Sequence, residues 1–481
     1  MPTRKEHDFI GELEIDDSLY YGIQTLRAVE NFNISHEKLK DFPGFVKALA
    51  QVKKAAALAN GELGLLDYKV QEAICWGCDQ IISGKFIDQF VVDMIQGGAG
   101  TSTNMNANEV IANLALEHMG HKKGEYKFCH PNDHVNLGQS TNDAYPTALR
   151  VAIYERLCEL TDAMRFLVEC FNKKAHEFRN IIKMGRTEMQ DAVPMTLGQE
   201  FKTYAVMLGE DIERVMEARN LVREMNLGGT AIGTGINSHP DYPTLVEAKL
   251  QEVTGRPFIK AGNLIEATQD TGAYVQISGV LKRVATKLGK ICADLRLLSS
   301  GPRCGFNEIN LPKIQPGSSI MPGKVNPVIP ELVSEVCYEV IGNDVTISLA
   351  AEGGQLQLNA FEPIIAYDLF NSIAMLRKAM RTMGEKCILG ITANVEVCKS
   401  HVYNSIGIVT AFNPYIGYEN SASIAKEALE TGKSVSQIAI ERDLLTKEQI
   451  EDILRPDNLL NPRMTAENKN KKFGKKIENL E

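Results

Sequence analysis

Apolar residues recur along the chain at the spacing of long helices. The clearest run lies in residues 263–298, where a series of apolar positions alternates in steps of four and three: Ile277, Leu281, Val284, Leu288, Ile291, Leu295 and Leu298. Such a heptad seam is typical of helices that pack lengthwise against other helices. Helical spacing also runs through residues 144–180, 195–226, 328–350 and 362–387. The pattern therefore predicts five long helices that form one bundle.

Strand patterns are rare in this sequence. Only the short apolar segments near residues 8–15 and 181–184 allow β structure. The apolar stripes of the long helices are also too broad for one five-helix bundle to cover. We therefore predict an all-α fold class with a central bundle of five long helices. The outer faces of this bundle are expected to pack against further protein.

Joints rich in glycine, asparagine and proline divide the chain into three predicted domains. One joint lies at residues 129–133 and the other at residues 390–394. The expected domains are a mostly helical N-terminal domain over residues 1–140, the bundle domain over residues 141–393, and a small helical domain over residues 394–481.

Composition narrows the classes of function. The 481 residues are 44% hydrophobic and 23% charged, which is an ordinary globular balance. The net charge of −9 disfavours nucleic acid and anionic membranes as partners. The sequence contains neither an apolar secretion signal near its start nor a run long enough to span a bilayer, so we expect a cytoplasmic protein. The basic run Asn468–Lys476 is expected to be a solvated tail.

Most familiar cofactor and metal motifs are missing. The ten cysteines are scattered, so most are expected to be reduced core thiols, and Cys75–Cys78 is the only CxxC. A Walker motif is excluded because Glu427 stands where its first glycine should be. The glycine-rich stretch Gly228–Gly235 does not match a dinucleotide fingerprint, and a plain helix connection is favoured there over direct ligand contact. We expect no dedicated metal site.

Small and hydroxylated residues gather just before predicted helices in four places: Gly97–Asn104, Gly138–Asp143, Gly185–Glu188 and Gly317–Pro327. Helix N-termini offer unpaired N–H groups and a positive dipole end, which bind carboxylates when hydroxyls and a Lys or Arg add donors. Each segment alone is typical of a helix cap. Together they predict a site for a small anion.

The last of these segments has more than a capping role. Ser318 and Ser319 are adjacent, glycines flank them, and Lys324 follows among several prolines. This composition is typical of a mobile loop that closes over a site.

The loop Gly317–Pro327 resembles the signature GSSxMPxKxNP of the aspartase/fumarase superfamily. The resemblance extends to about residue 460. The segments Ser140–Thr147 and Asp191–Phe201 are most similar to the aspartase branch of that superfamily, because class II fumarases typically have a second serine at the position of Thr141.

The resemblance implies a lyase that removes a Cβ proton from a C4 dicarboxylate and expels ammonia or water through an aci-carboxylate dianion. It implies deamination of L-aspartate to fumarate, with Ser318 as general base and Lys324 assisting. The implied binding residues are Thr101, Ser140, Thr141 and Ser319 for the carboxylate that becomes the dianion, Thr187, Lys324 and Asn326 for the other carboxylate, Asn142 for the amino group, and Met321 in the site. It also implies a homotetramer with active sites shared by three subunits and no organic cofactor, with a divalent cation as an activator at most.

Position 188 departs from the family pattern, because Glu188 stands where fumarases and some aspartases have His and other aspartases have Gln. One hypothesis is that Glu188 contacts the substrate ammonium and favours aspartate over malate. The other is that it turns away to pair with a basic residue. The alternative functions are a class II fumarase, another fumarate-releasing lyase of the superfamily, a catalytically silent structural tetramer, and a monomeric helical adaptor.

Overall fold

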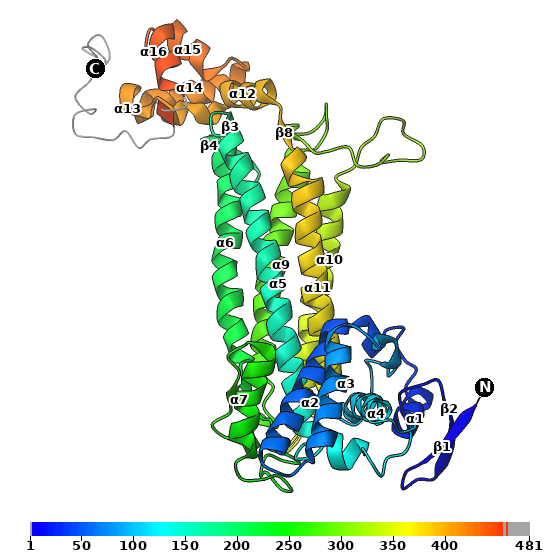
Figure 1. The fold of residues 1–481 in the computed structure, drawn as a ribbon. Coiled ribbons are helices and arrows are strands. Elements are labelled where there is room, and N and C mark those ends of the chain that lie inside the picture. Colours follow the sequence, from blue (N-terminus) through cyan, green and yellow to red (C-terminus); the bar gives the residue numbers. More distant parts are fainter. Residues whose placement is uncertain (1, 456–457, 460–481) are drawn as a thin grey trace. The chain divides into compact units, whose positions relative to one another are not determined.

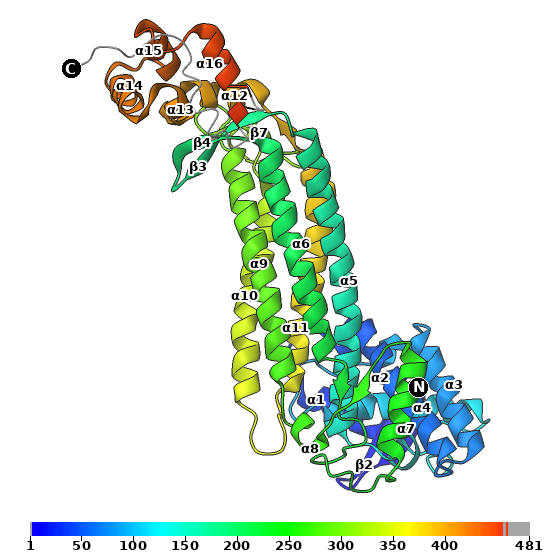
Figure 2. The ribbon, with the colours of Figure 1, turned by 90° about the vertical axis from the view of Figure 1, so that its left-hand side faces the viewer.

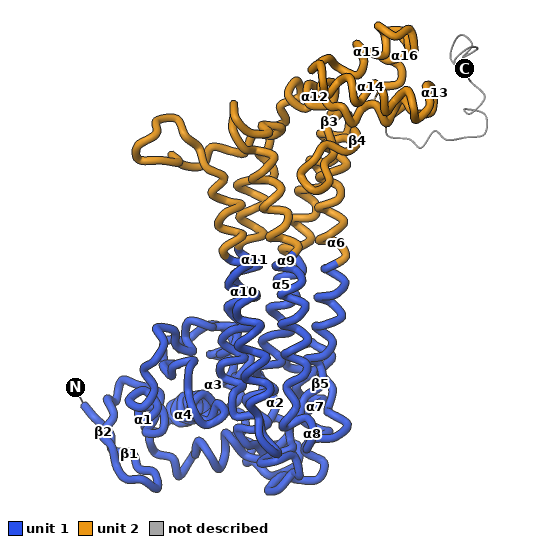
Figure 3. Tube along the Cα trace, turned by 180° about the vertical axis from the view of Figure 1, so that it is seen from behind, with its two compact units in different colours: residues 1–162, 211–286, 336–378 blue, residues 163–210, 287–335, 379–481 orange. Residues whose placement is uncertain are grey.

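The computed structural model describes residues 2–455 and 458–459, so the predicted tail Asn468–Lys476 lies outside the described residues. The chain forms two compact units, coloured separately in Figure 3. Unit 1 comprises residues 1–162, 211–286 and 336–378, and unit 2 comprises residues 163–210, 287–335 and 379–481. The domain boundaries expected from the sequence stay predictions.

The five predicted long helices are present (Figures 1 and 2). They are α5 (Thr141–Glu177), α6 (Leu197–Leu221), α9 (Gly272–Leu298), α10 (Val328–Glu352) and α11 (Glu362–Lys386). Each contributes one part to unit 1 and the other part to unit 2. The seven apolar residues of the predicted seam are all buried. The predicted all-α class is confirmed.

The predicted helix over residues 263–298 is interrupted. A short helix α8 (Leu264–Ala267) comes first, and α9 begins only at Gly272. The Asp270 carboxylate accepts the N–H of Gly272 at 3.2 Å, so a local side-chain bond competes with helix continuation at this point. Apolar periodicity alone does not reveal such a break.

Unit 1 also holds the helices of the N-terminal segment and one helix from a later part of the chain. They are α1 (Ile23–Asn31), α2 (Pro43–Glu62), α3 (Tyr68–Ile82), α4 (Thr101–His118) and α7 (Tyr242–Thr254), with short helical turns at Leu39–Asp41, Ile87–Gln89 and Pro131–Val135. The helix α4 is buried on all sides from Thr103 to Leu116.

Unit 2 ends in short helices that pack around Phe412, Ile424 and Ile438. They are α12 (Val395–Asn404), α13 (Asn413–Ile416), α14 (Tyr418–Thr431), α15 (Val435–Glu441) and α16 (Lys447–Ile453), with 3₁₀ turns at Ile388–Gly390 and Ile406–Ala411. No helix of the described residues is both long and apolar enough to cross a membrane.

Among the described residues, the strands form four two-stranded sheets. They are β1 (Thr3–His7) with β2 (Glu12–Asp16), β3 (Ile182–Thr187) with β4 (Gln190–Thr196), β5 (Glu224–Met225) with β6 (Ile259–Lys260), and β7 (Ile309–Asn310) with β8 (Thr392–Ala393). Strands β2 and β3 overlap the two segments predicted for β structure. The expectation that β structure is confined to those segments is wrong, because each strand needs a partner and several partners are too short or too polar to show alternation.

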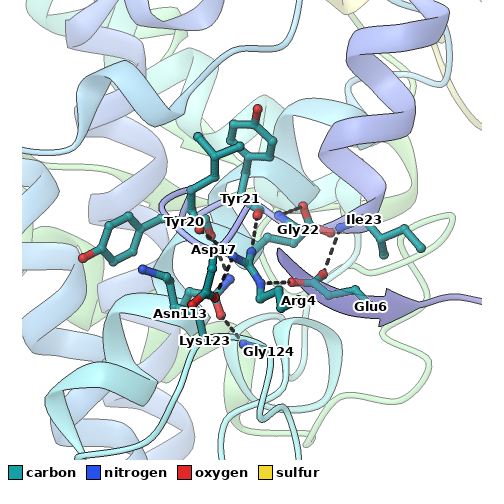
Figure 4. A network of polar contacts seen from close by, with 12 residues as sticks. Arg4, Glu6, Asp17, Tyr20, Tyr21, Gly22, Ile23, Asn113, Lys123 and Gly124 are labelled. Atoms are coloured by element: carbon teal, nitrogen blue, oxygen red, sulfur yellow. Dashed lines mark hydrogen bonds and ion pairs between the residues drawn. The ribbon is translucent and has the colours of Figure 1, made fainter. Parts of the chain in front are cut away.

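A buried ionic network joins the N-terminal hairpin to α1 (Figure 4). The Arg4 guanidinium donates to the carbonyls of Leu19 and Tyr21 at 2.8 and 2.7 Å, and to Glu6 at 2.8 Å. The other oxygen of Glu6 accepts the N–H of Ile23, the first residue of α1. The chain start is thereby fixed to the helices of unit 1.

The start of α4 requires a glycine. Gly100 has φ +91°, and a Cβ added there would lie 2.3 Å from Cδ2 of Tyr145, a buried residue of α5. Because Thr101 follows directly, the ring of Tyr145 and the backbone of Gly100 together set where the first turn of α4 lies against α5.

Gly84 provides a matched comparison, because it has φ +92° and open space around its Cβ position. We expect Gly84→Ala to cost about 1 kcal/mol, which is the backbone strain alone. Gly100→Ala adds overpacking against Tyr145 and is expected to cost about 3 kcal/mol. Thermal unfolding at equal protein concentration measures both variants, and equal losses would contradict a steric role for Tyr145.

Candidate functional site

The predicted site residues fall into two groups. Thr101, Ser140, Thr141 and Asn142 lie in unit 1, and Thr187, Glu188, Ser318, Ser319, Met321, Lys324 and Asn326 lie in unit 2.

In unit 1 the starts of α4 and α5 come together. The side-chain amide of Asn104, one turn into α4, donates to Thr141 Oγ1 at 3.3 Å. Ser140 precedes α5, and its N–H donates to Asp143 at 2.8 Å. The exposed hydroxyl of Thr101 donates to the carbonyl of Gly98 at 2.8 Å. Two helix N-termini with hydroxyl side chains thus lie beside each other, which suits binding of an anion.

Asn142 is oriented by its neighbours. Its Nδ2 donates to the carbonyl of Ala231 at 2.7 Å, and its own carbonyl accepts from Asn226 at 2.9 Å. The side chain keeps Oδ1 as an acceptor, which suits a donor such as an ammonium group, and it keeps the second N–H of Nδ2 as a donor.

The stretch Gly228–Gly235 connects β5 to α7, so a two-residue strand precedes it where the sequence predicted a plain connection between helices. Its N–H groups at Gly228 and Thr230 both donate to Asp143 Oδ2 at 3.0 Å. Burial raises the pKa of Asp143 to about 6, although these donors and the charge of Lys53 act in the other direction. The stretch therefore holds Asp143, and with it the first turn of α5, by two hydrogen bonds.

Lys53 is a buried residue of α2 that was not among the predicted site residues. Its Nζ is fully buried and donates to Asn136 Oδ1 and Gln139 Oε1, each at 2.9 Å. Burial lowers the pKa of Lys53 to about 7. A signal existed in the sequence, since Lys53 shares a helical face with the buried residues Val46, Leu49 and Ala56. A lysine at an apolar position of a helix indicates a buried polar partner.

In unit 2, Thr187 and Glu188 lie at the tip of the β3–β4 hairpin. Thr187 pairs with Gln190, so Glu188 and Met189 form a two-residue turn. Both have positive φ, at +52° and +65°, which matches a type I′ turn. Glycine and asparagine are the usual residues there, so two longer side chains in this geometry are unusual. No hydrogen bond or ion pair joins Glu188 to another described residue, and its side chain is exposed.

The loop Gly317–Pro327 is closed by its own hydrogen bonds. The Gly317 N–H donates to the carbonyl of Lys324 at 2.8 Å, and Asn326 Nδ2 donates to the carbonyl of Gly317 at 2.7 Å. Ser318, Met321 and Lys324 line a hollow of about 490 Å³, and the neighbouring Ser319 is exposed. The structure therefore brings three of the predicted residues to one space.

Ser318 has an environment that stabilises negative charge. Its Oγ accepts the N–H groups of Ile320 and Met321 at 3.2 and 3.0 Å. Two backbone donors aimed at one oxygen have the arrangement of an oxyanion hole. These two N–H groups hold Ser318 Oγ in the loop as a hydrogen-bond acceptor.

Metal ligands do not gather in the described part of the chain, where no group of three or more His, Cys, Asp and Glu side chains is arranged to hold an ion. All ten cysteines are free thiols, and seven of them are buried. The prediction that most are core thiols is confirmed.

Two family models match the chain. One is described as a lyase family and matches residues 11–342, and the other is described as the fumarase C C-terminus and matches residues 408–461. Among solved structures, a fumarate lyase:delta crystallin from Brucella melitensis, bound to cobalt, is 53% identical with a TM-score of 0.94, covering 96% of this chain and 100% of that one. A class II fumarase from Schistosoma mansoni is 36% identical with a TM-score of 0.90, covering 95% and 98%.

Two similar curated relatives are named aspartate ammonia-lyase. The protein from Helicobacter pylori strain J99 is 68% identical over 97% of this chain and 100% of its own length. The protein from Escherichia coli K12 is 56% identical over 96% and 97%. The chain therefore belongs to the aspartase/fumarase superfamily of lyases and, within it, to the aspartate ammonia-lyase family.

Proposed function

We propose that this enzyme reversibly deaminates L-aspartate to fumarate and ammonia. The observation that carries the proposal is the loop Gly317–Pro327, where Ser318 and Lys324 line one hollow and two N–H groups face Ser318 Oγ. The relatives named aspartate ammonia-lyase, at 56 to 68% identity, support the same reaction.

Ser318 acts as the general base in this mechanism. Each unit by which its pKa falls requires about 1.4 kcal/mol of extra stabilisation of the alkoxide. The N–H groups of Ile320 and Met321 and the charge of Lys324 are the available sources of that stabilisation. The alkoxide takes the proton from Cβ, and the electron pair of the broken C–H bond moves into the adjacent carboxylate to give the aci-carboxylate dianion.

The dianion then expels ammonia, because its electron pair returns to form the carbon–carbon double bond as the Cα–N bond breaks. The proposed donors to the developing dianion are Thr101, Ser140, Thr141 and Ser319, and those to the other carboxylate are Thr187, Lys324 and Asn326. Asn326 Nδ2 has a second hydrogen beyond the one given to Gly317, so it can still donate to a carboxylate.

The amino group is assigned to Asn142 and Glu188. Asn142 Oδ1 accepts from the ammonium form, because the bond from Nδ2 to Ala231 fixes the orientation of the side-chain amide. Glu188 adds an exposed carboxylate at the tip of the hairpin. A negative charge there attracts a substrate ammonium, which aspartate has and malate lacks. Malate is the substrate expected of the alternative, a class II fumarase.

We also propose that the active enzyme is a homotetramer whose active sites each take loops from three subunits. In unit 1, α10 exposes Tyr338, Val345 and Leu349 by 66, 59 and 66%. With Gly342 between them, these residues repeat in steps of four and three, which is the pattern of a helix that packs against further helices.

No organic cofactor enters this mechanism, and we propose that a divalent cation acts as an activator at most. We place the enzyme in the cytoplasm, because its ten cysteines are free thiols, as is usual in a reducing compartment.

The base is tested by Ser318→Ala. Fumarate absorbance is followed after the purified enzyme is mixed with L-aspartate, with L-malate in a parallel cuvette. We expect fumarate from aspartate alone, and a loss of about 10³-fold in kcat for Ser318→Ala, because the alanine cannot accept the Cβ proton. Fumarate from malate alone would instead support the fumarase alternative, and a variant as active as the wild type would exclude Ser318 as the base.

The substrate preference is tested by Glu188→Gln, which removes the charge and keeps the shape. We expect the KM for aspartate to rise about fivefold, in line with the modest energy of an exposed ion pair. Met189→Leu, in the same turn but uncharged, is the control and should leave KM unchanged. If Glu188→Gln kept both the KM and the aspartate-to-malate preference, Glu188 would have no role in recognition.

The assembly is tested by Val345→Glu, which places a charge in the exposed seam of α10, the row formed by Tyr338, Gly342, Val345 and Leu349. We expect the native mass to fall below four chains and the activity to fall with it, because a buried unpaired charge is not tolerated in an interface. Leu429→Glu on α14 is the control, since this leucine is 73% exposed and lies outside the seam. A tetrameric, active Val345→Glu enzyme would contradict the seam as an interface.

A further inference from the structure

The mechanism leaves one buried ionic cluster of unit 2 without a role. At its centre lies Glu308, whose side chain is completely buried. Its Oε1 lies 2.7 Å from Arg186 Nη1 and 3.1 Å from His401 Nδ1, and its Oε2 lies 3.1 Å from Lys183 Nζ. Lys183 also contacts Glu200 at the start of α6. A single carboxylate thus meets three basic side chains from two separate segments of the chain.

Two of these basic residues belong to strand β3, whose last residue is Thr187. Arg186 directly precedes Thr187, and its guanidinium also covers the ring of Phe306 at 4.2 Å. Because Thr187 and Glu188 follow Arg186 at once, a shift of the Arg186 backbone moves both. The side chain of Arg186, which bonds Glu308 and His401 and covers Phe306, is therefore the connection closest in sequence that ties the hairpin tip to the rest of unit 2.

The backbone of Glu308 is fixed as firmly as its side chain. Its N–H donates to the carbonyl of Leu298 at the end of α9, and its carbonyl accepts the N–H of Asn394, each at 2.9 Å. The next residues form β7, which pairs with β8, and the chain then runs on to the loop Gly317–Pro327. Glu308 is therefore an anchored point from which the hairpin can be held.

We infer that Glu308 is a positioning residue for the reaction, and that its carboxylate sets the place of the β3–β4 hairpin and so of Thr187 and Glu188. The inference rests on the proposed function, since it assigns Thr187 and Glu188 to the substrate. Glu308 itself touches no substrate. It acts through Lys183 and Arg186.

The charge of Glu308, more than its packing, lets this residue hold the β3–β4 hairpin. Burial alone raises the pKa of the Glu308 carboxyl, but the charge of Lys183 and the bonds from Arg186 and His401 outweigh burial and hold the pKa below its usual value. Glu308 is therefore ionised at neutral pH. Its removal takes the nearest carboxylate from Arg186, whose other carboxylate partner, Asp191, lies 3.9 Å away, while Lys183 keeps Glu200.

Glu308→Gln tests the inference, because it keeps the shape and removes the charge. The measurements are kcat and KM for L-aspartate on the full-length enzyme, with the native mass and thermal midpoint recorded beside them. We expect kcat/KM to fall about tenfold, which is what displacement of a binding group by a fraction of an ångström costs. Asp211→Asn is the matched control, since Asp211 is equally buried and its bonded partner is Arg283 on α9. We expect the control to stay within about twofold of the wild type.

A double-variant cycle separates positioning from general destabilisation. If Glu308 acts through the hairpin, adding Glu308→Gln to an enzyme that already carries Thr187→Val and Glu188→Gln costs little beyond those two changes alone. His401→Gln is the milder second variant in case Glu308→Gln does not fold, because it removes the contacts of His401 with Glu308 and Arg186 but keeps the bond between those two residues. We expect this variant to lose about threefold in kcat/KM, and to lose nothing further when Thr187→Val and Glu188→Gln are already present.

Losses that multiply in full, or a Glu308→Gln enzyme within twofold of the wild type, would overturn the inference. A folded wild-type enzyme that forms no fumarate from aspartate would instead overturn the proposed function. The two failures are thus distinguished in the same experiment.

Discussion

A charge taken out of water must be paired where it lies, and both groups of site residues depend on this constraint. In unit 1, Asp143 and Lys53 are buried together behind the start of α5 and between them hold its preceding loop and the glycine-rich stretch. In unit 2, Glu308 is buried against Lys183, Arg186 and His401. These buried charges bond the segments that carry Ser140 to Asn142 in unit 1 and Thr187 and Glu188 in unit 2.

The residues that fix the backbone differ from the residues assigned to the substrate, so the site itself needs few charged residues. Ser140 and Thr141 are uncharged, yet an anion can be bound by helix N-termini and hydroxyls alone. The backbone N–H groups at Ile320 and Met321 serve the same purpose at the oxygen of Ser318. Such donors are effective only when their geometry is fixed before the substrate arrives.

The sequence predicted those parts of the molecule that short-range patterns encode. The heptad spacing of Ile277 to Leu298 predicts α9, and the composition of Gly317–Pro327 predicts its loop. The turn at Glu188 and Met189 was not predicted, since neither residue is typical of a type I′ turn. Glu308 was also missed, because its partners are more than 90 residues away along the chain and nothing in its neighbourhood marks it as buried. Pairings of that kind follow from the fold, which must be known first.

The hairpin tip combines an unusual backbone with an exposed carboxylate. Two consecutive residues with side chains in the left-handed region cost about 1 to 2 kcal/mol each, so a turn of this kind persists only where its flanks hold it. The register of β3 and β4 holds it from one side, and the contact of Met184 with the C-terminal helices holds it from the other. Arg186, bonded to Glu308, adds the restraint nearest the tip. The rigid base of the hairpin therefore lets Glu188 keep its left-handed backbone. A recognition residue also requires a rigid base, because a carboxylate on a freely moving turn discriminates poorly between an ammonium and a hydroxyl group.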